Sequence, residues 1–290
     1  MNRISETDLI LNNDGSAYHL NLLPGDIADT IITVGDPDRV SGISKYFDAI
    51  ELKKGKREFI THTGRIGNKR LTVLSTGIGT DNIDIVLNEL DALANIDFTT
   101  RLPHSQLKSL DIIRIGTSGA VQADIPIDSL LASTAAFGLD PLMHYYVQNL
   151  SDKEQQLLNA FKANLPGGML SPYIASANGG LLAALGAGLQ QGITITAPGF
   201  YAPQGRQVRA ANAIPQLMDI IQQFNFEGNR ITNLEMETAG IYGLAAALGH
   251  KALSLNVILA NRITQTFSKQ PANIMDHFIK FLLEKLTNSL

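Results

Sequence analysis

Hydrophobic residues along the chain form short runs, separated by longer segments in which apolar positions recur with helical spacing. The runs are rich in Ile, Val and Leu and fit strands that are covered on both faces. They lie at residues 30–34, 71–74, 111–115, 129–132, 193–196 and 253–259. Amphipathic helices are predicted at 83–93, 152–163, 181–189, 214–223, 236–248 and 274–286. This alternation predicts an α/β protein whose sheet carries helices on both faces.

Composition narrows the classes of function. The 290 residues include 44% hydrophobic positions, and no Pro/Ser-rich linker or internal repeat divides them, so we expect one large core. The formal net charge is −4, without a long basic run, which argues against general nucleic-acid binding. The absence of cysteine excludes disulfides, thiolate metal sites and a thiol nucleophile.

Other classes of site and location are also disfavoured. No apolar stretch reaches the roughly 18 residues of a membrane helix, and the first residues lack the apolar centre of a secretory signal. We therefore expect a cytoplasmic protein. The six histidines follow no metal-ligand spacing, and no GxSxG motif is present, so neither a metal enzyme nor covalent catalysis is predicted.

Three predicted strands run directly into glycine-containing turns. The turns are Gly35-Asp36-Pro37, Thr76-Gly77-Ile78-Gly79 and Gly116-Thr117-Ser118-Gly119. In open α/β folds ligands gather at the carboxyl ends of strands, and glycine lets backbone N–H groups approach an anion. None of the turns matches a Walker P-loop or a dinucleotide GxGxxG, so the predicted ligand is a small anion rather than a nucleoside triphosphate or NAD.

Three arginines stand where a positive charge requires an explanation. Arg114 lies inside a strand-like run, and a buried guanidinium without an anionic partner costs several kcal/mol. A salt bridge to a nearby carboxylate and a bound anion both satisfy that requirement. Arg39 follows a predicted helix start, and Arg57 lies in a basic cluster, so solvent exposure is the simple explanation for these two.

Two further segments carry groups suited to a nucleoside. Glu235 and Glu237 lie at a strand-to-helix junction, where the helix dipole favours acids and where a carboxylate can accept bonds from a ribose diol. Phe200, Gln204 and Arg206 share a Pro/Gly loop, which is either an ordinary surface loop or a platform for a flat heterocycle. The amide and guanidinium together match the alternating carbonyl and N–H edge of uracil.

These segments taken in order resemble the nucleoside phosphorylase family (NP-I type), most closely its uridine phosphorylase members. The resemblance is carried by Gly35–Arg39, Arg57–Phe59, Ser75–Gly79, Arg114–Gly119, Phe200–Arg206, Glu235–Glu237 and Asn261-Arg262. It implies a single-domain, three-layer α/β/α fold with a central mixed, partly barrel-like sheet. Residues 18–290 would form this domain, and residues 1–17 an N-terminal extension.

The resemblance also implies a role for each matched residue. Inorganic phosphate would be held by Gly35, Arg39, Arg114 and Thr117, with Ser118 beside it and Arg57 supplied by a neighbouring subunit. Glu237 would bind the ribose diol, Glu235 and Met236 would line the sugar, and His19 with Tyr18 would reach the 5′ hydroxyl from the neighbour. Phe200 would pack on the base, Gln204 and Arg206 would bind its edge, and Arg262 would support them.

The implied reaction is reversible phosphorolysis of uridine to uracil and α-D-ribose 1-phosphate, in nucleoside salvage. No cofactor is implied beyond phosphate as co-substrate, although a monovalent cation can lie between subunits near Glu58, Ile78 and Asn82. Asn82 replaces the usual Ser, and Thr80 replaces a glycine. The implied assembly shares each site across a dimer interface, as in a homohexamer built from three dimers. Alternatives are a purine nucleoside phosphorylase of the same fold, a nucleosidase, and a non-catalytic nucleoside-binding protein.

Overall fold

The computed structural model describes residues 3–168 and 170–288, and most of its strands join one mixed sheet. The strand order along this sheet is β11-β12-β10-β8-β13-β7-β1-β4-β3-β2, with β9 beside β8 and β14 beside β13. The strands are β1 (Thr30–Val34), β2 (Ala49–Lys56), β3 (Phe59–Ile66), β4 (Lys69–Ser75), β7 (Asp111–Ala120), β8 (Leu130–Gly138), β9 (Tyr173–Ser176), β10 (Gln190–Thr196), β11 (Asn225–Phe226), β12 (Asn229–Glu235), β13 (Lys251–Asn261) and β14 (Thr266–Phe267).

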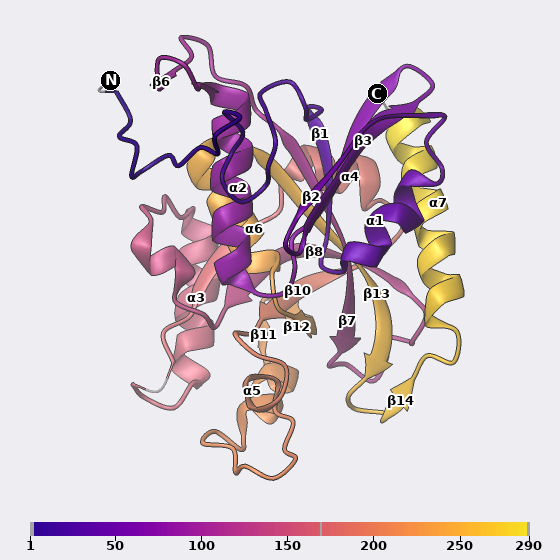
Figure 1. Cartoon of the computed structure of the whole chain (residues 1–290). Helices are drawn as coiled ribbons and strands as arrows, with labels where there is room; N and C mark the ends of the chain where they lie inside the picture. The colour runs from indigo at the N-terminus through magenta and orange to yellow at the C-terminus, as the bar shows by residue number, and fades with distance from the viewer. Residues whose placement is uncertain (1–2, 169, 289–290) are drawn as a thin grey trace.

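Five of these strands close into a barrel. β12 pairs with β10, β10 with β8, β8 with β13 and β13 with β7. The ring closes because β7 is long enough to turn back onto β12, where Ala120 pairs with Asn233 and Gly119 with Leu234. β1 and β4 extend the sheet from β7 in parallel, which sets their carboxyl ends beside those of the barrel strands. Figure 1 shows this open part of the sheet above the ends of β7 and β13.

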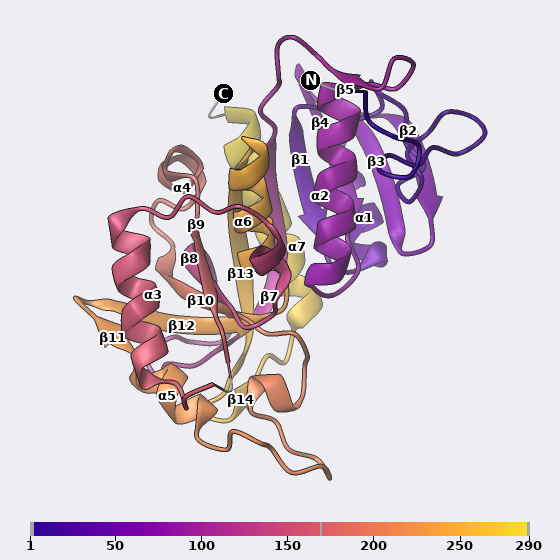
Figure 2. The ribbon, with the colours of Figure 1, turned by 90° about the vertical axis from the view of Figure 1, so that its left-hand side faces the viewer.

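Helices cover the sheet in separate layers. Figure 1 shows α2 and α6 on one side of the open sheet and α1 and α7 on the other. Figure 2 shows α3 and α5 over the barrel end. The helices are α1 (Pro37–Ser44), α2 (Thr80–Asn95), α3 (Asp152–Asn164), α4 (Gly179–Leu185), α5 (Leu217–Gln223), α6 (Thr238–Leu248) and α7 (Pro271–Asn288). None of the helices in the described ranges is long and apolar enough to cross a membrane.

All six predicted strands are present, and the differences from prediction have simple causes. The hairpin β2–β3 was not predicted because β2 is an edge strand whose residues are all exposed or half-buried, and it therefore lacks an apolar run. The predicted helix at 181–189 ends at Leu185, since Gly186 caps it and Gly188 turns the chain with φ of 79° into β10.

The N-terminal segment packs on a small two-stranded hairpin formed by β5 (Ile96–Asp97) and β6 (Leu102–Pro103). Arg101 Nη1 donates to the Leu9 carbonyl over 2.6 Å, and the Ile4 N–H donates to the Arg101 carbonyl over 2.9 Å. Leu9 also packs against Ala92 and Ile96. The described part of the N-terminal segment, residues 3–17, thus contacts the hairpin beside the end of α2. The division of the chain at residue 18 stays a prediction.

Candidate active site

A cavity of about 760 Å³ lies where β1, β4, β7, β12 and β13 end. The strand-end turns of the sheet therefore meet at one place, as the glycine pattern predicted. The predicted site residues that line this cavity are Gly35, Arg39, Glu58, Ile78, Asn82, Arg114, Thr117, Ser118, Phe200, Gln204, Arg206, Glu235, Met236 and Glu237.

The Gly35 turn and Arg39 form one wall of the cavity. Asp36 caps α1 by accepting the Asp38 N–H over 3.0 Å, and Pro37 begins the helix, so Arg39 lies in the first turn. A Cβ at Gly35 would lie 3.4 Å from the Gly77 carbonyl, so the two turns approach closely. Arg39 Nη1 donates to the Ile115 carbonyl over 3.3 Å. Burial lowers the pKa of the Arg39 guanidinium, which has no carboxylate in contact among the described residues.

Arg114 lies at the centre of a buried polar cluster. Nη2 lies 2.5 Å from Glu237 Oε2 and 3.1 Å from Glu235 Oε2, and Nη1 donates to Asn256 Oδ1 over 2.8 Å. The side chain is 6% exposed. Gly116 provides the space that the guanidinium occupies, since a Cβ there would lie 1.7 Å from Nη1. The predicted salt bridge is present, and the same guanidinium lines the cavity.

The two glutamates have different environments. Glu235 accepts hydrogen bonds from Thr196 Oγ1 and from the Glu237 and Thr238 N–H groups, so it holds the start of α6. Glu237 Oε1 accepts only the Gly79 N–H over 2.8 Å, while Oε2 pairs with Arg114. Burial raises the pKa of the Glu237 carboxyl, and Arg114 partly offsets that effect. Glu237 therefore has acceptor capacity left for a ligand, whereas Glu235 is largely committed to the backbone.

The loop from Phe200 to Arg206 forms the opposite end of the cavity. Arg206 Nη1 donates to Gln204 Oε1 over 2.5 Å and to the Phe200 carbonyl over 2.8 Å. Its Cζ lies 3.8 Å from the centre of the Phe200 ring. Arg262 Nη1 supports the loop from behind by donating to the Gln204 carbonyl over 2.9 Å. Burial lowers the pKa of Arg206 to about 10, so the guanidinium stays charged near neutral pH.

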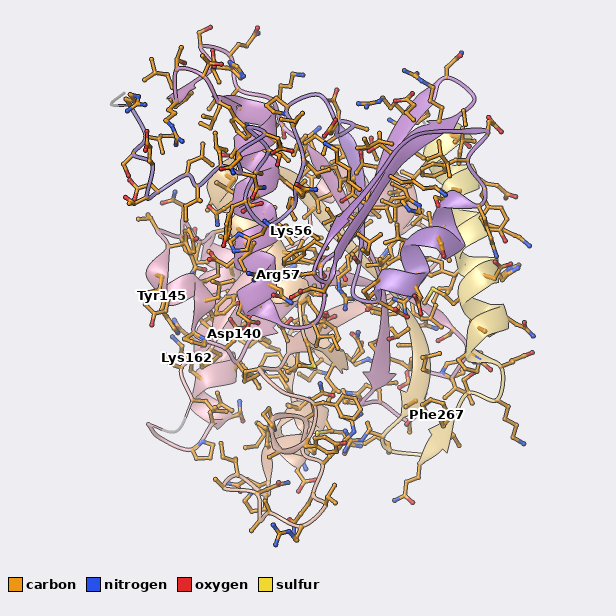
Figure 3. The ribbon with its side chains drawn as sticks, in the orientation of Figure 1. Lys56, Arg57, Asp140, Tyr145, Lys162 and Phe267 are labelled. Atoms are coloured by element: carbon orange, nitrogen blue, oxygen red, sulfur yellow. The ribbon has the colours of Figure 1, made fainter. Side chains whose placement is uncertain are left out.

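Four predicted residues do not line the cavity of their own subunit: Tyr18, His19, Arg57 and Arg262. Arg57 lies at the β2–β3 turn with φ of 55°, exposed, and no ion pair joins it to another described residue. Figure 3 shows Lys56 and Arg57 together at this turn, well apart from Phe267 at the β14 hairpin. His19 Nδ1 lies 2.6 Å from Glu89 Oε1 on α2. Tyr18 and His19 contact each other, and Tyr18 is linked to the residue before Arg57 because Lys56 Nζ donates to the Tyr18 carbonyl.

The three residues predicted near a monovalent cation do lie together. A Cβ at Gly77 would lie 2.5 Å from Asn82 Nδ2 and 3.0 Å from Glu58 Cγ. Asn82 Nδ2 also lies 3.5 Å from the Ile78 carbonyl, to which it donates. The amide uses one of the two lone pairs of this carbonyl, so the carbonyl can still accept a further partner.

Several site residues were not predicted. Asn256 and Gly116 position Arg114, Asn233 Nδ2 donates to Ser118 Oγ over 3.0 Å, and Phe267 lines the cavity from β14. A weak signal exists for Asn256, since an amide inside the apolar run Leu253–Leu259 has to be hydrogen-bonded. Phe267 carries no such signal, because a single aromatic residue in a loop is common.

The cavity combines three features: arginines at strand ends that can hold a small anion, the buried carboxylate of Glu237, and an aromatic loop that carries the Gln204 amide. Such a combination is typical of an enzyme that acts on nucleosides. Residues 29–284 match the model of the phosphorylase superfamily. The chain therefore belongs to this superfamily, as a pentosyltransferase of the nucleoside phosphorylase family, and the predicted resemblance is confirmed.

The chain is similar to uridine phosphorylases and also to purine nucleoside phosphorylases. A uridine phosphorylase of Thermococcus kodakarensis is 31% identical over 278 residues, which cover 93% of this chain and 88% of the relative. A DeoD-type purine nucleoside phosphorylase of Tolumonas auensis is 27% identical over 271 residues, covering 92% and 97%.

A solved structure confirms the predicted fold. The crystal structure of a Trypanosoma brucei nucleoside phosphorylase, which shows uridine phosphorylase activity, superposes with a TM-score of 0.88 at 29% identity. The match covers 97% of this chain and 100% of that one. The predicted mixed sheet with a barrel-like part is therefore correct.

Proposed function

We propose that the protein is a uridine phosphorylase, which converts uridine and phosphate reversibly to uracil and α-D-ribose 1-phosphate. The observation that carries the proposal is the pair formed by Gln204 and Arg206 in the cavity, held by Phe200 and Arg262. An amide and a guanidinium side by side offer the donors and the acceptor that the O2, N3 and O4 edge of uracil needs.

Phosphate is the nucleophile, so the reaction needs no covalent intermediate with the protein. We expect the Gly35 N–H, Arg39, Arg114 and Thr117 to hold the anion below C1′, with Ser118 beside it. A phosphate oxygen attacks C1′ as the bond from C1′ to N1 breaks, and the bonding electrons leave with uracil. Gln204 and Arg206 then stabilise the charge that develops on the base. Attack opposite the base inverts C1′ and yields the α-phosphate.

The ribose would lie between the proposed phosphate site and the proposed base site formed by Gln204 and Arg206. Glu237 accepts hydrogen bonds from the 2′ and 3′ hydroxyls through its remaining lone pairs, while Met236 and Glu235 line the sugar. Because Glu237 also pairs with Arg114, one carboxylate links the ribose site to the phosphate site. Positive charge that develops at C1′ is stabilised by the bound phosphate.

Asn261 argues against a purine substrate. Members that act on purines place an acid near this strand end to protonate the base, as the family resemblance implies. Asn261 is 2% exposed, its Nδ2 donates to the Gln122 and Ile125 carbonyls, and its Oδ1 accepts the Ile263 and Thr264 N–H groups. An amide committed in this way cannot supply a proton.

The location of Arg57, Tyr18 and His19 supports a shared site. An exposed arginine without an ion pair among the described residues and a histidine outside its own cavity fit a subunit that donates both to a neighbour. The proposed assembly is at least a dimer, and three such dimers would form the proposed homohexamer. A monovalent cation near Glu58, Ile78 and Asn82 remains part of the proposal.

A substrate panel tests the proposed activity. Purified protein is incubated with uridine, thymidine, inosine or adenosine, each with and without phosphate, and free base and ribose 1-phosphate are measured. Release of uracil only with phosphate supports the proposal. Reaction with purines alone would replace it by a purine phosphorylase, and release of base without phosphate would indicate a nucleosidase.

Replacing Gln204 with alanine is expected to lower kcat/KM for uridine by about 10²-fold, because a donor to the leaving base is lost. The KM for phosphate should change little, since the Gln204 carbonyl stays bound to Arg262. Gln207→Ala is the matched control, because Gln207 is exposed at the end of the same loop. If the variant impairs the kinetics for phosphate as much as those for uridine, the role of the loop is structural.

Mixing two inactive variants is expected to restore activity. In an oligomer that contains Arg57→Ala and Arg114→Ala subunits, the cavity of the first keeps Arg114 and receives Arg57 from the second. In a dimer with one subunit of each kind, one of the two sites is complete, so about half of the wild-type sites form under this symmetry. Differently tagged subunits are co-expressed, purified through both tags and assayed. A mixture as inactive as its parents would place Arg57 in the cavity of its own subunit or outside the reaction.

A further inference from the structure

We propose that Asn12, in the N-terminal segment, is a positioning residue for the active site of the neighbouring subunit. It would act by tying the loop that carries His19 to β2, the strand that ends directly before Arg57. The inference rests on the proposed function, since it takes Arg57 and His19 to be the residues that one subunit donates to the next. The family model begins at residue 29, so Asn12 lies outside the part of the chain that it matches.

Asn12 bonds to two segments at once. Its Nδ2 donates to Ser16 Oγ and to the Ala17 carbonyl, each over 2.9 Å. Its Oδ1 accepts Lys56 Nζ over 2.9 Å. Both polar atoms of the amide are therefore used, one toward the His19 loop and one toward β2.

Lys56 completes the connection from the other side. Its Nζ donates to the Tyr18 carbonyl over 2.5 Å and lies 4.4 Å from the centre of the Tyr18 ring. Asn12, Tyr18 and Lys56 thus form a closed set of contacts. Lys56 is the last residue of β2 and directly precedes Arg57. Figure 3 shows these two neighbours together at the end of the hairpin, beside α2.

Backbone conformation makes the position of Arg57 depend on this set. Arg57 has φ of 55°, in the left-handed region that non-glycine residues adopt only when their surroundings hold them there. Its exposed side chain forms no ion pair with the described residues, so the backbone alone directs it. Losing the contacts of Lys56 would let the turn relax and move the guanidinium.

His19 is fixed on its far side by α2. The Glu89 carboxylate accepts the His19 N–H over 3.0 Å and the Leu20 N–H over 2.8 Å, and contacts His19 Nδ1. The donated group is therefore held between Glu89 on one side and the Asn12–Lys56 pair on the other.

Replacing Asn12 with alanine is expected to raise the KM for phosphate about tenfold and to lower kcat less, because a shift of one ångström at a positioned group can cost 10²-fold. Lys56→Met should give at least the same change, because it also loses the contacts with Tyr18, and the double variant should be no worse than Lys56→Met alone. Asn13→Ala is the matched control, since Asn13 is exposed next to Asn12. Thermal unfolding of all variants verifies the fold.

Mixed oligomers assign the effect to the donating subunit. In the first mixture, subunits with Asn12→Ala and Arg57→Ala are combined with Arg114→Ala subunits. The only complete cavity then receives Arg57 from a subunit with intact Asn12, and the KM for phosphate should equal that of the wild type. In the second mixture Asn12→Ala is moved to the Arg114→Ala subunit, and the KM should rise about tenfold.

The outcomes separate this inference from the proposed function. If the wild type releases no uracil with phosphate, the proposed function has failed. If the wild type is active and Asn12→Ala has the kinetics of Asn13→Ala, the positioning role is wrong. Equal KM values in the two mixtures, or two inactive mixtures, would likewise overturn it, because Asn12 would then not act through the donated residues.

Discussion

Replacing Arg114 with alanine is expected to lower kcat/KM for phosphorolysis by about 10³-fold, with phosphate saturation lost. Arg114 is the one guanidinium that lines the cavity and is also paired with Glu237, over 2.5 Å. Its removal therefore takes away a proposed phosphate ligand and the cation that pairs with Glu237, the proposed ribose carboxylate. Steady-state kinetics with varied phosphate and varied uridine measure both losses.

Arg114→Lys should not rescue the reaction. Lysine keeps the charge, but one ammonium cannot replace the fork that bonds Asn256 through Nη1 and the two glutamates through Nη2. Arg230→Ala is the matched control, because Arg230 pairs with Asp124 at the surface. A folded Arg114→Ala protein with the turnover of this control would contradict the assignment of the phosphate site.

The Arg114→Ala protein is expected to fold, although its free energy of unfolding should fall by about 3 kcal/mol. Glu235 keeps its bonds from Thr196 and from two backbone N–H groups of α6. Glu237 keeps the Gly79 N–H, and burial raises the pKa of its carboxyl, so it can bind a proton when the guanidinium is removed. The loss of activity can therefore be separated from unfolding.

Much of the fold could be predicted, because most of its strands are covered on both faces. Runs such as 111–115 and 253–259 are predominantly apolar, and that pattern is visible in the sequence. β2 is an edge strand with three lysines among its last four residues and gives no comparable pattern. Closure of the barrel depends on the pairing of Gly119 and Ala120 with β12, a contact between distant segments that no local pattern specifies.

Part of the candidate site could also be predicted from the sequence, and part of it could not. The three glycine turns could be predicted to meet, since parallel strands share one edge for their carboxyl ends. Asn256 and Gly116 could not be assigned to Arg114, because their roles arise from packing across β7 and β13. The position of Arg57 depends on the turn at the end of β2. The neighbouring Lys56 bonds to Asn12, which lies 44 residues earlier in the chain, and no local pattern specifies such a contact.

Glu237→Gln is the second change with a large expected effect, a loss of about 10²-fold to 10³-fold in kcat/KM for uridine. Both carboxylate oxygens face donors, Gly79 N–H at Oε1 and Arg114 Nη2 at Oε2. An amide has only one oxygen, so either orientation places its NH₂ group against one of these donors. The acceptor left for the ribose hydroxyls is then misplaced, and Arg114 loses its charged partner. Initial rates with saturating phosphate measure the loss.

Glu235→Gln provides the comparison that separates catalysis from folding. Glu235 lies two residues away on the same strand end and is buried like Glu237, but its oxygens hold Thr196 Oγ1 and the first N–H groups of α6. The Glu235 variant should therefore lower the melting temperature more, while the Glu237 variant should lower turnover more. If the two variants lose turnover to the same extent, Glu237 has no role beyond packing, and the ribose has to be bound elsewhere in the cavity.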